Sequence, residues 1–300
     1  MAVITTDHVQ AIPMSEEERQ SGKYSLETLG KALEAMHQDG LVVLKNVIDV
    51  EIIQKLNEKM CADAEKRIAD PTQQYNHGVK SNFLQRPPVT DPEYLHKDVY
   101  FNPFLLQLAN AYLGHKPVWN WLTANTALAN TKGMRQLSHK DGSFAHPLYP
   151  YYFIANIPLC DFSVENGATE FWLGSHAQAT WRDQQLATET GMPQYPVCRK
   201  GEPIPPITEE AKATRMKIRP PIQPLCCQGD IMIRDLRLWH AGMPNESDKH
   251  RIMLGLGYAQ NFFLGNAGDM VDVRAQFYGE EEFEKTTNDT IFNLRPTYLE

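Results

Sequence analysis

The sequence has few of the features that mark secreted, membrane or nucleic-acid-binding proteins. Its five cysteines are an odd number and include no C-x-x-C pair, which argues against a disulfide framework or a zinc ribbon. No apolar run is long enough to span a membrane, and the first 20 residues lack the apolar core of a signal peptide. The 37 acidic residues outnumber the 29 basic ones, and no Lys/Arg cluster stands out. We therefore expect a cytoplasmic protein that binds neither membrane nor nucleic acid.

The composition is that of an ordered globular protein. Of the 300 residues, 42% are hydrophobic, and 12 Phe, 12 Tyr and 5 Trp can supply a sizeable core. No repeat or linker divides the chain, so we expect a single domain over residues 1–300. Residues 177–228 are polar and rich in proline, which is typical of a lid or a surface insertion.

Hydrophobic periodicity and capping residues predict helices in the first part of the chain and strands in the second. The predicted helices cover residues 25–40, 49–68 and 102–114, with a short buried strand at 41–44 and a loop at 69–101. The later predicted strands cover residues 118–124, 151–157, 168–172, 230–234 and 251–258. Strict alternation in the first of these strands places Trp119 and Trp121 on one face. This order favours an antiparallel β core with helices packed outside.

An H-x-D pair offers an imidazole and a carboxylate to one metal ion, because residues two apart on a strand face the same way. The pattern occurs three times, beginning at His37, His96 and His139. His37 lies at the end of a predicted helix, and His96 lies in a charged loop, so neither context favours a ligand. His139, followed by Asp141, stands among the predicted strands, where a β core can bring a distant third ligand alongside.

His240 is the candidate third ligand. It follows the strand-like run that begins at Ile231, and Arg251 follows after a turn at the start of the next predicted strand. Two imidazoles and one carboxylate suit Fe(II) and leave coordination positions open. The planar guanidinium of Arg251 suits the far carboxylate of a dicarboxylic acid, which it can bind bidentately. We predict iron ligation by His139, Asp141 and His240, with Arg251 beside them.

Four ordered segments resemble the phytanoyl-CoA dioxygenase family, especially its fungal natural-product branch. They are residues 39–45 (Asp-Gly-Leu-Val-Val-Leu-Lys), 136–142 (Gln-Leu-Ser-His-Lys-Asp-Gly), 166–176 (Asn-Gly-Ala-Thr-Glu-Phe-Trp-Leu-Gly-Ser-His), and His240 with Arg251. The chain departs from the family pattern at Leu173, which replaces a proline in the turn before Gly-Ser-His.

The resemblance implies a mainly β fold with flanking α-helices, a double-stranded β-helix or jelly roll of the cupin kind. It implies that Arg251 binds the C5 carboxylate of 2-oxoglutarate and that Gln136 and Thr169 touch this cosubstrate. It also implies a homodimer, as in many fungal members. A carboxylate at Asp141 argues against halogenation, since related halogenases have a small residue there.

The implied reaction uses Fe(II), 2-oxoglutarate and O₂ to oxidise an unactivated C–H bond, with release of succinate and CO₂. Hydroxylation, desaturation, epoxidation and rearrangement remain open as outcomes. We expect a small, mainly apolar metabolite from secondary metabolism as the substrate. Phe144, Tyr149, Tyr152 and Trp172 are candidates to line its pocket, with ordinary core packing as the alternative. Two alternatives remain: a cupin-type metalloenzyme that does not use 2-oxoglutarate, and an inactive family member that serves as a binding subunit.

Overall fold

The computed structural model describes residues 9–76, 80–142, 147–179, 183–184, 204–261 and 291–292. Four helices of the N-terminal part follow their capping residues. They are α1 (Glu16–Ser21), α2 (Leu26–Asp39), α3 (Val50–Ile68) and α5 (Pro103–Leu113). The last three confirm the predicted helices to within about a residue, whereas α1 was not predicted. In α2, for example, the Ser25 side chain accepts a hydrogen bond from the Thr28 N–H, and Gly40 ends the helix in the left-handed conformation.

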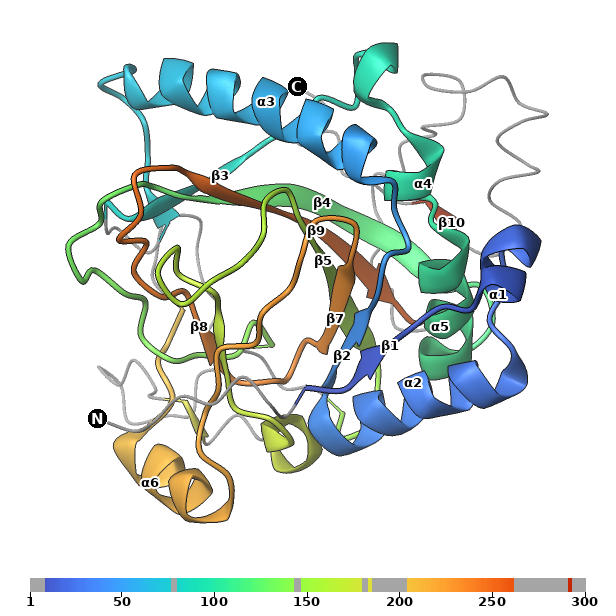
Figure 1. Cartoon of the computed structure of the whole chain (residues 1–300). Coiled ribbons are helices and arrows are strands. Elements are labelled where there is room, and N and C mark those ends of the chain that lie inside the picture. The colour runs from blue at the N-terminus through green and yellow to red at the C-terminus, as the bar shows by residue number, and fades with distance from the viewer. Residues whose placement is uncertain are drawn as a thin grey trace.

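Most strands join one large mixed sheet, in the order β1-β2-β7-β5-β9-β4-β10, with β3 also paired to β4 (Figure 1). The strands are β1 (Ala11–Ile12), β2 (Leu41–Leu44), β3 (Asn82–Gln85), β4 (Val118–Ala127), β5 (Tyr152–Pro158), β7 (Ile231–Asp235), β9 (Arg251–Ala259) and β10 (Ile291–Phe292). Among the strands of the described residues, only the pairs β1–β2 and β4–β10 are parallel. A second, two-stranded sheet pairs β6 (Glu170–Phe171) with β8 (His240–Ala241). The predicted mainly β core with outer helices is confirmed.

The large sheet has one apolar face and one face that borders a cavity. Residues such as Phe153, Ile233 and Leu254 pack with α2, α3 and α5 in the main hydrophobic core. Their neighbours in sequence, such as Ile154 and Arg234, line the cavity on the opposite side. This alternation follows from the period of two in a strand. It directs a row of side chains from several strands into one space.

The strand β4 breaks this alternation. Trp119 pairs with Tyr258 of β9 and Trp121 pairs with Gly257, so the register shifts at Asn120 in a β-bulge. Trp119 therefore lies in the main core, while Trp121 lines the cavity. The prediction that the two tryptophans share a face is wrong, because the extra residue reverses the orientation of the residues after it.

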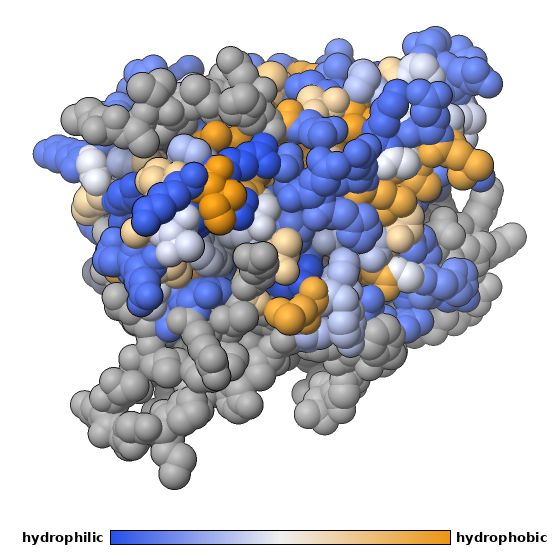
Figure 2. Space-filling model, turned by 90° about the horizontal axis from the view of Figure 1, so that it is seen from below, coloured by the Kyte–Doolittle hydropathy of each residue, from blue (hydrophilic) through white to orange (hydrophobic). Residues whose placement is uncertain are grey.

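The predicted loop and the predicted insertion both contain regular structure. The segment 69–101 holds β3, the 3-10 helix η2 (Pro92–Tyr94) and α4 (Lys97–Tyr100). The proline-rich segment 177–228 begins in the 3-10 helix η3 (Ser175–Gln178) and contains α6 (Glu209–Ile218). Among the described residues, no helix is both long and apolar enough to cross a membrane. The face in Figure 2 is mostly hydrophilic, with hydrophobic residues in small separate groups.

Candidate active site

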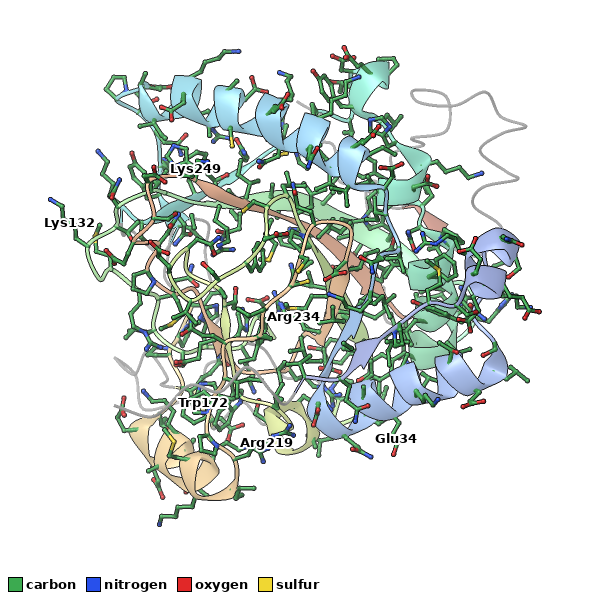
Figure 3. The ribbon with its side chains drawn as sticks, viewed as in Figure 1. Glu34, Lys132, Trp172, Arg219, Arg234 and Lys249 are labelled. Carbon is green, nitrogen blue, oxygen red and sulfur yellow. The ribbon has the colours of Figure 1, made fainter. Side chains whose placement is uncertain are left out.

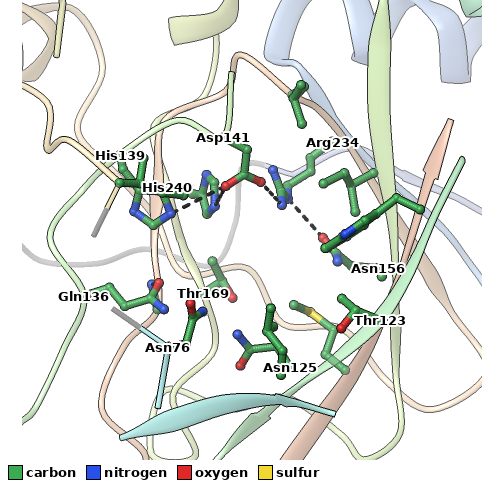
Figure 4. A pocket seen from close by; sticks show the side chains of 18 of the residues that line it. Asn76, Thr123, Asn125, Gln136, His139, Asp141, Asn156, Thr169, Arg234 and His240 are labelled. Carbon is green, nitrogen blue, oxygen red and sulfur yellow. Dashed lines mark hydrogen bonds and ion pairs between the residues drawn. The ribbon is translucent and has the colours of Figure 1, made fainter. Parts of the chain in front are cut away.

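Backbone pairing brings His139 and His240 together although 100 residues separate them. The two residues form an antiparallel bridge, in which the N–H of His139 donates to the carbonyl of His240 at 2.9 Å and the reverse bond measures 2.8 Å. Their ring centroids lie 4.4 Å apart. Asp141, two residues beyond His139, turns its carboxylate to the same point (Figure 4).

Both imidazoles are oriented by a hydrogen bond at Nδ1. Nδ1 of His139 lies 2.8 Å from the Leu137 carbonyl, and Nδ1 of His240 lies 3.0 Å from the Leu238 carbonyl. A carbonyl can only accept, so each Nδ1 carries the proton and each Nε2 carries a lone pair. The Nε2 atoms lie 3.7 and 3.6 Å from Oδ1 of Asp141. One ligand atom from each residue thus lies within 4.8 Å of the others, a donor set that suits a divalent metal.

The protonation states also suit a metal. Burial lowers the pKa of His139, and burial together with Arg234 lowers the pKa of His240 well below its ordinary value. Burial acts to raise the pKa of Asp141, but Arg234 and the two histidines outweigh it and hold this pKa well below its usual range. At neutral pH the site therefore offers two neutral imidazoles and one carboxylate.

Arg234 of β7 holds the carboxylate of Asp141, a role that no sequence motif predicted. Its Nη2 donates to Oδ2 of Asp141 at 2.6 Å, and its Nε donates to Oδ1 of Asn156 at 3.1 Å. Figure 3 shows Arg234 inside the molecule, and Figure 4 shows it between these two partners. Because Oδ2 of Asp141 is engaged, Oδ1 is the oxygen that faces the histidines.

Arg251, at the start of β9, is a buried cation in the wall of the same cavity. Its side chain is almost fully buried, its Nε donates to the Asn166 carbonyl at 3.3 Å, and its guanidinium lies 4.9 Å from the Phe162 ring centroid. Among the described residues no carboxylate pairs with it, and Nη1 has no hydrogen-bond partner. Burial lowers its pKa to about 10, so it is charged at neutral pH. A buried, uncompensated cation is costly and suits an anionic ligand.

Gln136 and Thr169 line this cavity as well. The Gln136 side-chain oxygen accepts the Gly242 N–H at 2.9 Å, which fixes the amide beside β8. Gly242 leaves room for this contact, since a Cβ there would lie 2.8 Å from the Gln136 amide. Gln136 and Thr169 are both buried and lie near the histidines (Figure 4).

The cavity has a volume of about 570 Å³ and reaches from Arg251 past the histidines to Trp121. Of the four aromatic residues expected to line it, Tyr152 does so. Trp172 instead packs against Ile207 and Trp239, and Tyr149 is 51% exposed. Phe144 lies outside the described residues. Trp121 was not predicted to line the cavity, because the bulge that places it there leaves no signal in the alternation pattern.

The other two H-x-D pairs lie away from this cavity, as their contexts predicted. His37 is in the last turn of α2, with its ring against Tyr112. His96 is the N-cap residue of α4. Within the described chain, the group around His139 is the only cluster with metal-ligand spacing.

Comparison with known proteins gives one family. The family model of phytanoyl-CoA dioxygenase (PhyH) matches residues 36–253. The iron/alpha-ketoglutarate-dependent dioxygenase penM of Penicillium thymicola is 30% identical over 166 residues, which is 51% of this chain and 52% of penM, so the match spans about half of that relative.

Two solved structures share the fold. The non-heme alpha-ketoglutarate-dependent epimerase SnoN from nogalamycin biosynthesis superposes with a TM-score of 0.53 at 17% identity, covering 79% of this chain and 84% of SnoN. EctD from S. alaskensis, solved with 2-oxoglutarate and 5-hydroxyectoine, gives 0.54 at 15% identity, covering 85% and 80%.

Proposed function

Because the chain belongs to the phytanoyl-CoA dioxygenase family, we propose that it is an iron(II)- and 2-oxoglutarate-dependent dioxygenase of a small molecule. The relative penM carries this activity in its name. The proposed reaction oxidises an unactivated C–H bond and converts 2-oxoglutarate and O₂ to succinate and CO₂. Hydroxylation is the simplest outcome, with desaturation or rearrangement as variants of the same attack.

The proposed iron ligands are Nε2 of His139, Oδ1 of Asp141 and Nε2 of His240. The residues fit the metal, because both imidazoles are neutral and oriented and the carboxylate is charged. When bound, iron with its cosubstrate supplies the oxidising power for attack on a C–H bond. Arg234 keeps one carboxylate oxygen of Asp141 directed toward the metal position.

The observation that carries the proposal is the buried guanidinium of Arg251 in the wall of the cavity that holds the three ligands. A dicarboxylate that reaches the metal position with one end would meet this cation with the other. The pair would be charge-assisted and shielded from water. Gln136 and Thr169 lie at the same cavity and would orient the bound cosubstrate.

Family membership also supports finer proposals. The large sheet and the small β6–β8 sheet, with the cavity between them, would form the two halves of a double-stranded β-helix. We propose one catalytic domain over residues 1–300, with 177–228 as a lid, and a homodimer as the assembly. The proposed setting is secondary metabolism in the cytoplasm.

Succinate formation tests this function. Purified protein with Fe(II), ascorbate and 2-oxoglutarate should form succinate in air, and His240→Ala should abolish this turnover. Arg251→Ala should abolish it too, while the exposed Arg19→Ala serves as the matched control. Unchanged turnover in Arg251→Ala, or activity with the metal but without 2-oxoglutarate, would favour a cupin-type metalloenzyme. Absence of a stoichiometric metal site would favour a binding subunit.

A further inference from the structure

The register of the sheet gives the cavity two ends. Arg251 and Gly257 are six residues apart on β9, which is about 20 Å along an extended strand. Gly257 pairs with Trp121 on one side and with Ile154 on the other, and Ile154 pairs in turn with Arg234. The region of Trp121 is therefore remote from Arg251 along β9, in the same row of the sheet as Ile154 and Arg234. We call it the distal end.

The distal end is mainly apolar. Its lining side chains are Trp121, Tyr152, Ile154 and Leu236, with Asn120 beside them. The nearest charged groups are Arg234 and Asp141, which form an ion pair, and Nη1 of Arg234 is buried without a hydrogen-bond partner. Within the described part of the lining, an ionised substrate at this end would meet no opposite charge that lacks an ion-pair partner. No interaction would then offset the free-energy cost of desolvating its charge.

The bulge in β4 directs two consecutive side chains, Asn120 and Trp121, into the distal end. In a regular strand one of them would point into the helical core. The register shift between Trp119 and Trp121 allows both to line the cavity. Bulges occur often beside binding sites, where they re-aim a side chain.

Asn120 presents an oriented amide. The Tyr152 hydroxyl donates to Oδ1 of Asn120 at 2.6 Å. This bond uses the amide oxygen and leaves the Nδ2 group as the donor available to a ligand. The Asn120 side chain is half-buried, so a ligand acceptor that replaces water there would make a hydrogen bond partly shielded from solvent.

Two glycines of β9 leave room for the side chains of Trp121 and Tyr152. A Cβ on Gly257 would lie 2.2 Å from the Tyr152 hydroxyl oxygen, and a Cβ on Gly255 would lie 3.0 Å from the Trp121 ring. Only glycine lets both side chains approach the strand so closely. The result is an aromatic wall held against the backbone of β9.

We propose that the distal end is the substrate subsite and that it selects a neutral molecule with a flat, unsaturated ring system and a carbonyl oxygen at its edge. The ring would lie against Trp121, and the carbonyl would accept a hydrogen bond from Asn120. Aromatic side chains favour offset stacking with such rings. This inference rests on the proposed function, since it places the substrate relative to the metal position. It argues against a coenzyme A thioester, whose phosphates would find no cation free of an ion pair among the described residues at this end.

Three probes separate the effect of the flat ring from the effect of charge. They are 2-naphthamide, its anionic analogue 2-naphthoate, and its saturated analogue decahydronaphthalene-2-carboxamide. Each would be titrated by calorimetry into the full-length protein loaded anaerobically with Fe(II) and 2-oxoglutarate. We expect 2-naphthamide to bind at least roughly tenfold tighter than either of the others.

Variants locate the binding. Trp121→Leu should lower the affinity for 2-naphthamide by roughly tenfold or more, and Asn120→Ala should lower it by roughly three- to tenfold. Trp172→Phe, which alters a tryptophan outside this cavity, is the matched control and should bind as the wild type does. Thermal melts verify folding. If Trp121→Leu is unfolded, Asn120→Ala decides, because it removes only a half-buried amide.

Equal or tighter binding of 2-naphthoate would overturn the inference. So would the absence of saturable 2-naphthamide binding below about 1 mM, or binding that neither variant weakens. The visible charge-transfer band of the Fe(II)–2-oxoglutarate complex is recorded on the same samples. It distinguishes failure of the substrate inference from failure of the proposed function. If the band forms and 2-naphthamide does not bind, only the substrate inference fails. If no band forms, the proposed function itself fails.

Discussion

Replacing Arg251 by methionine should stabilise the protein alone and weaken its binding of 2-oxoglutarate. Methionine is similar in length and has no charge, so it can fill the buried site. Folding places the guanidinium in a cavity wall with no carboxylate partner among the described residues. The wild-type protein therefore bears a desolvation cost that a bound dicarboxylate would offset.

The size of this cost follows from the lowered pKa. Burial moves the pKa of Arg251 from 12.5 to about 10, which corresponds to a loss of about 3 kcal/mol in folding free energy at neutral pH. The sign holds because both values lie above pH 7, where the folded and unfolded chains both carry the charge. Loss of the Asn166 bond and the Phe162 contact offsets part of the gain, so the net stabilisation is about 1–3 kcal/mol. The expected rise in Tm is roughly 2–6 °C.

Binding should change in the opposite direction. Removing one partner of a buried charge pair costs about 2–5 kcal/mol, so 2-oxoglutarate affinity should fall at least roughly 30-fold. Thermal melts with and without 2-oxoglutarate, in the presence of Zn(II), measure both effects in one experiment. The control Arg19→Met alters an exposed arginine and should change neither value. An Arg251→Met protein with a lower Tm and an intact ligand-induced shift would refute the reasoning.

Further variants test the rest of the site. Asp141→Ala should weaken Zn(II) or Co(II) binding by roughly 100-fold or more in calorimetry, since it removes the one anionic ligand; wild-type affinity would remove this residue from the site. Gln136→Ala should raise the KM for 2-oxoglutarate several-fold while leaving metal affinity within roughly twofold, and an unchanged KM would show that this amide does not touch the cosubstrate. Because burial lowers the pKa values of His139 and His240, protons compete with metal only below their ordinary pKa of about 6.5. Metal affinity should therefore be flat from about pH 7 to 8 and decline in more acidic solution, whereas a decline that begins above pH 7 would contradict the lowered values.

The helices and central strands were predictable because local signals agreed with the fold. Ser25 and Gly40 bracket α2, and Asn102 with Pro103 begins α5. The strand β3 was missed for a physical reason. Its Asn82 and Gln85 are polar although buried, so the apolar alternation that marks an ordinary strand is absent.

The three metal ligands were predictable from their spacing and order in the sequence. The arginine that holds the carboxylate of Asp141 was not. Arg234 directly follows three apolar residues of β7, and a charged side chain buried in such a strand is costly unless it has a partner. That cost is the signal that could have identified it beforehand. The bulge at Asn120 has no such signal, because it depends on the register between β4 and β9. Sequence alternation therefore assigned Trp121 the same face as Trp119.

The most direct test is anaerobic titration of the metal-free protein with Fe(II) and 2-oxoglutarate, followed by visible absorption. The three-residue site predicts a charge-transfer band that saturates at one Fe(II) per chain and requires both components. The same titration of His240→Ala should give no band. A wild-type protein that binds no stoichiometric Fe(II), or that gives no band with 2-oxoglutarate, would contradict the assignment of His139, Asp141 and His240 as the iron site.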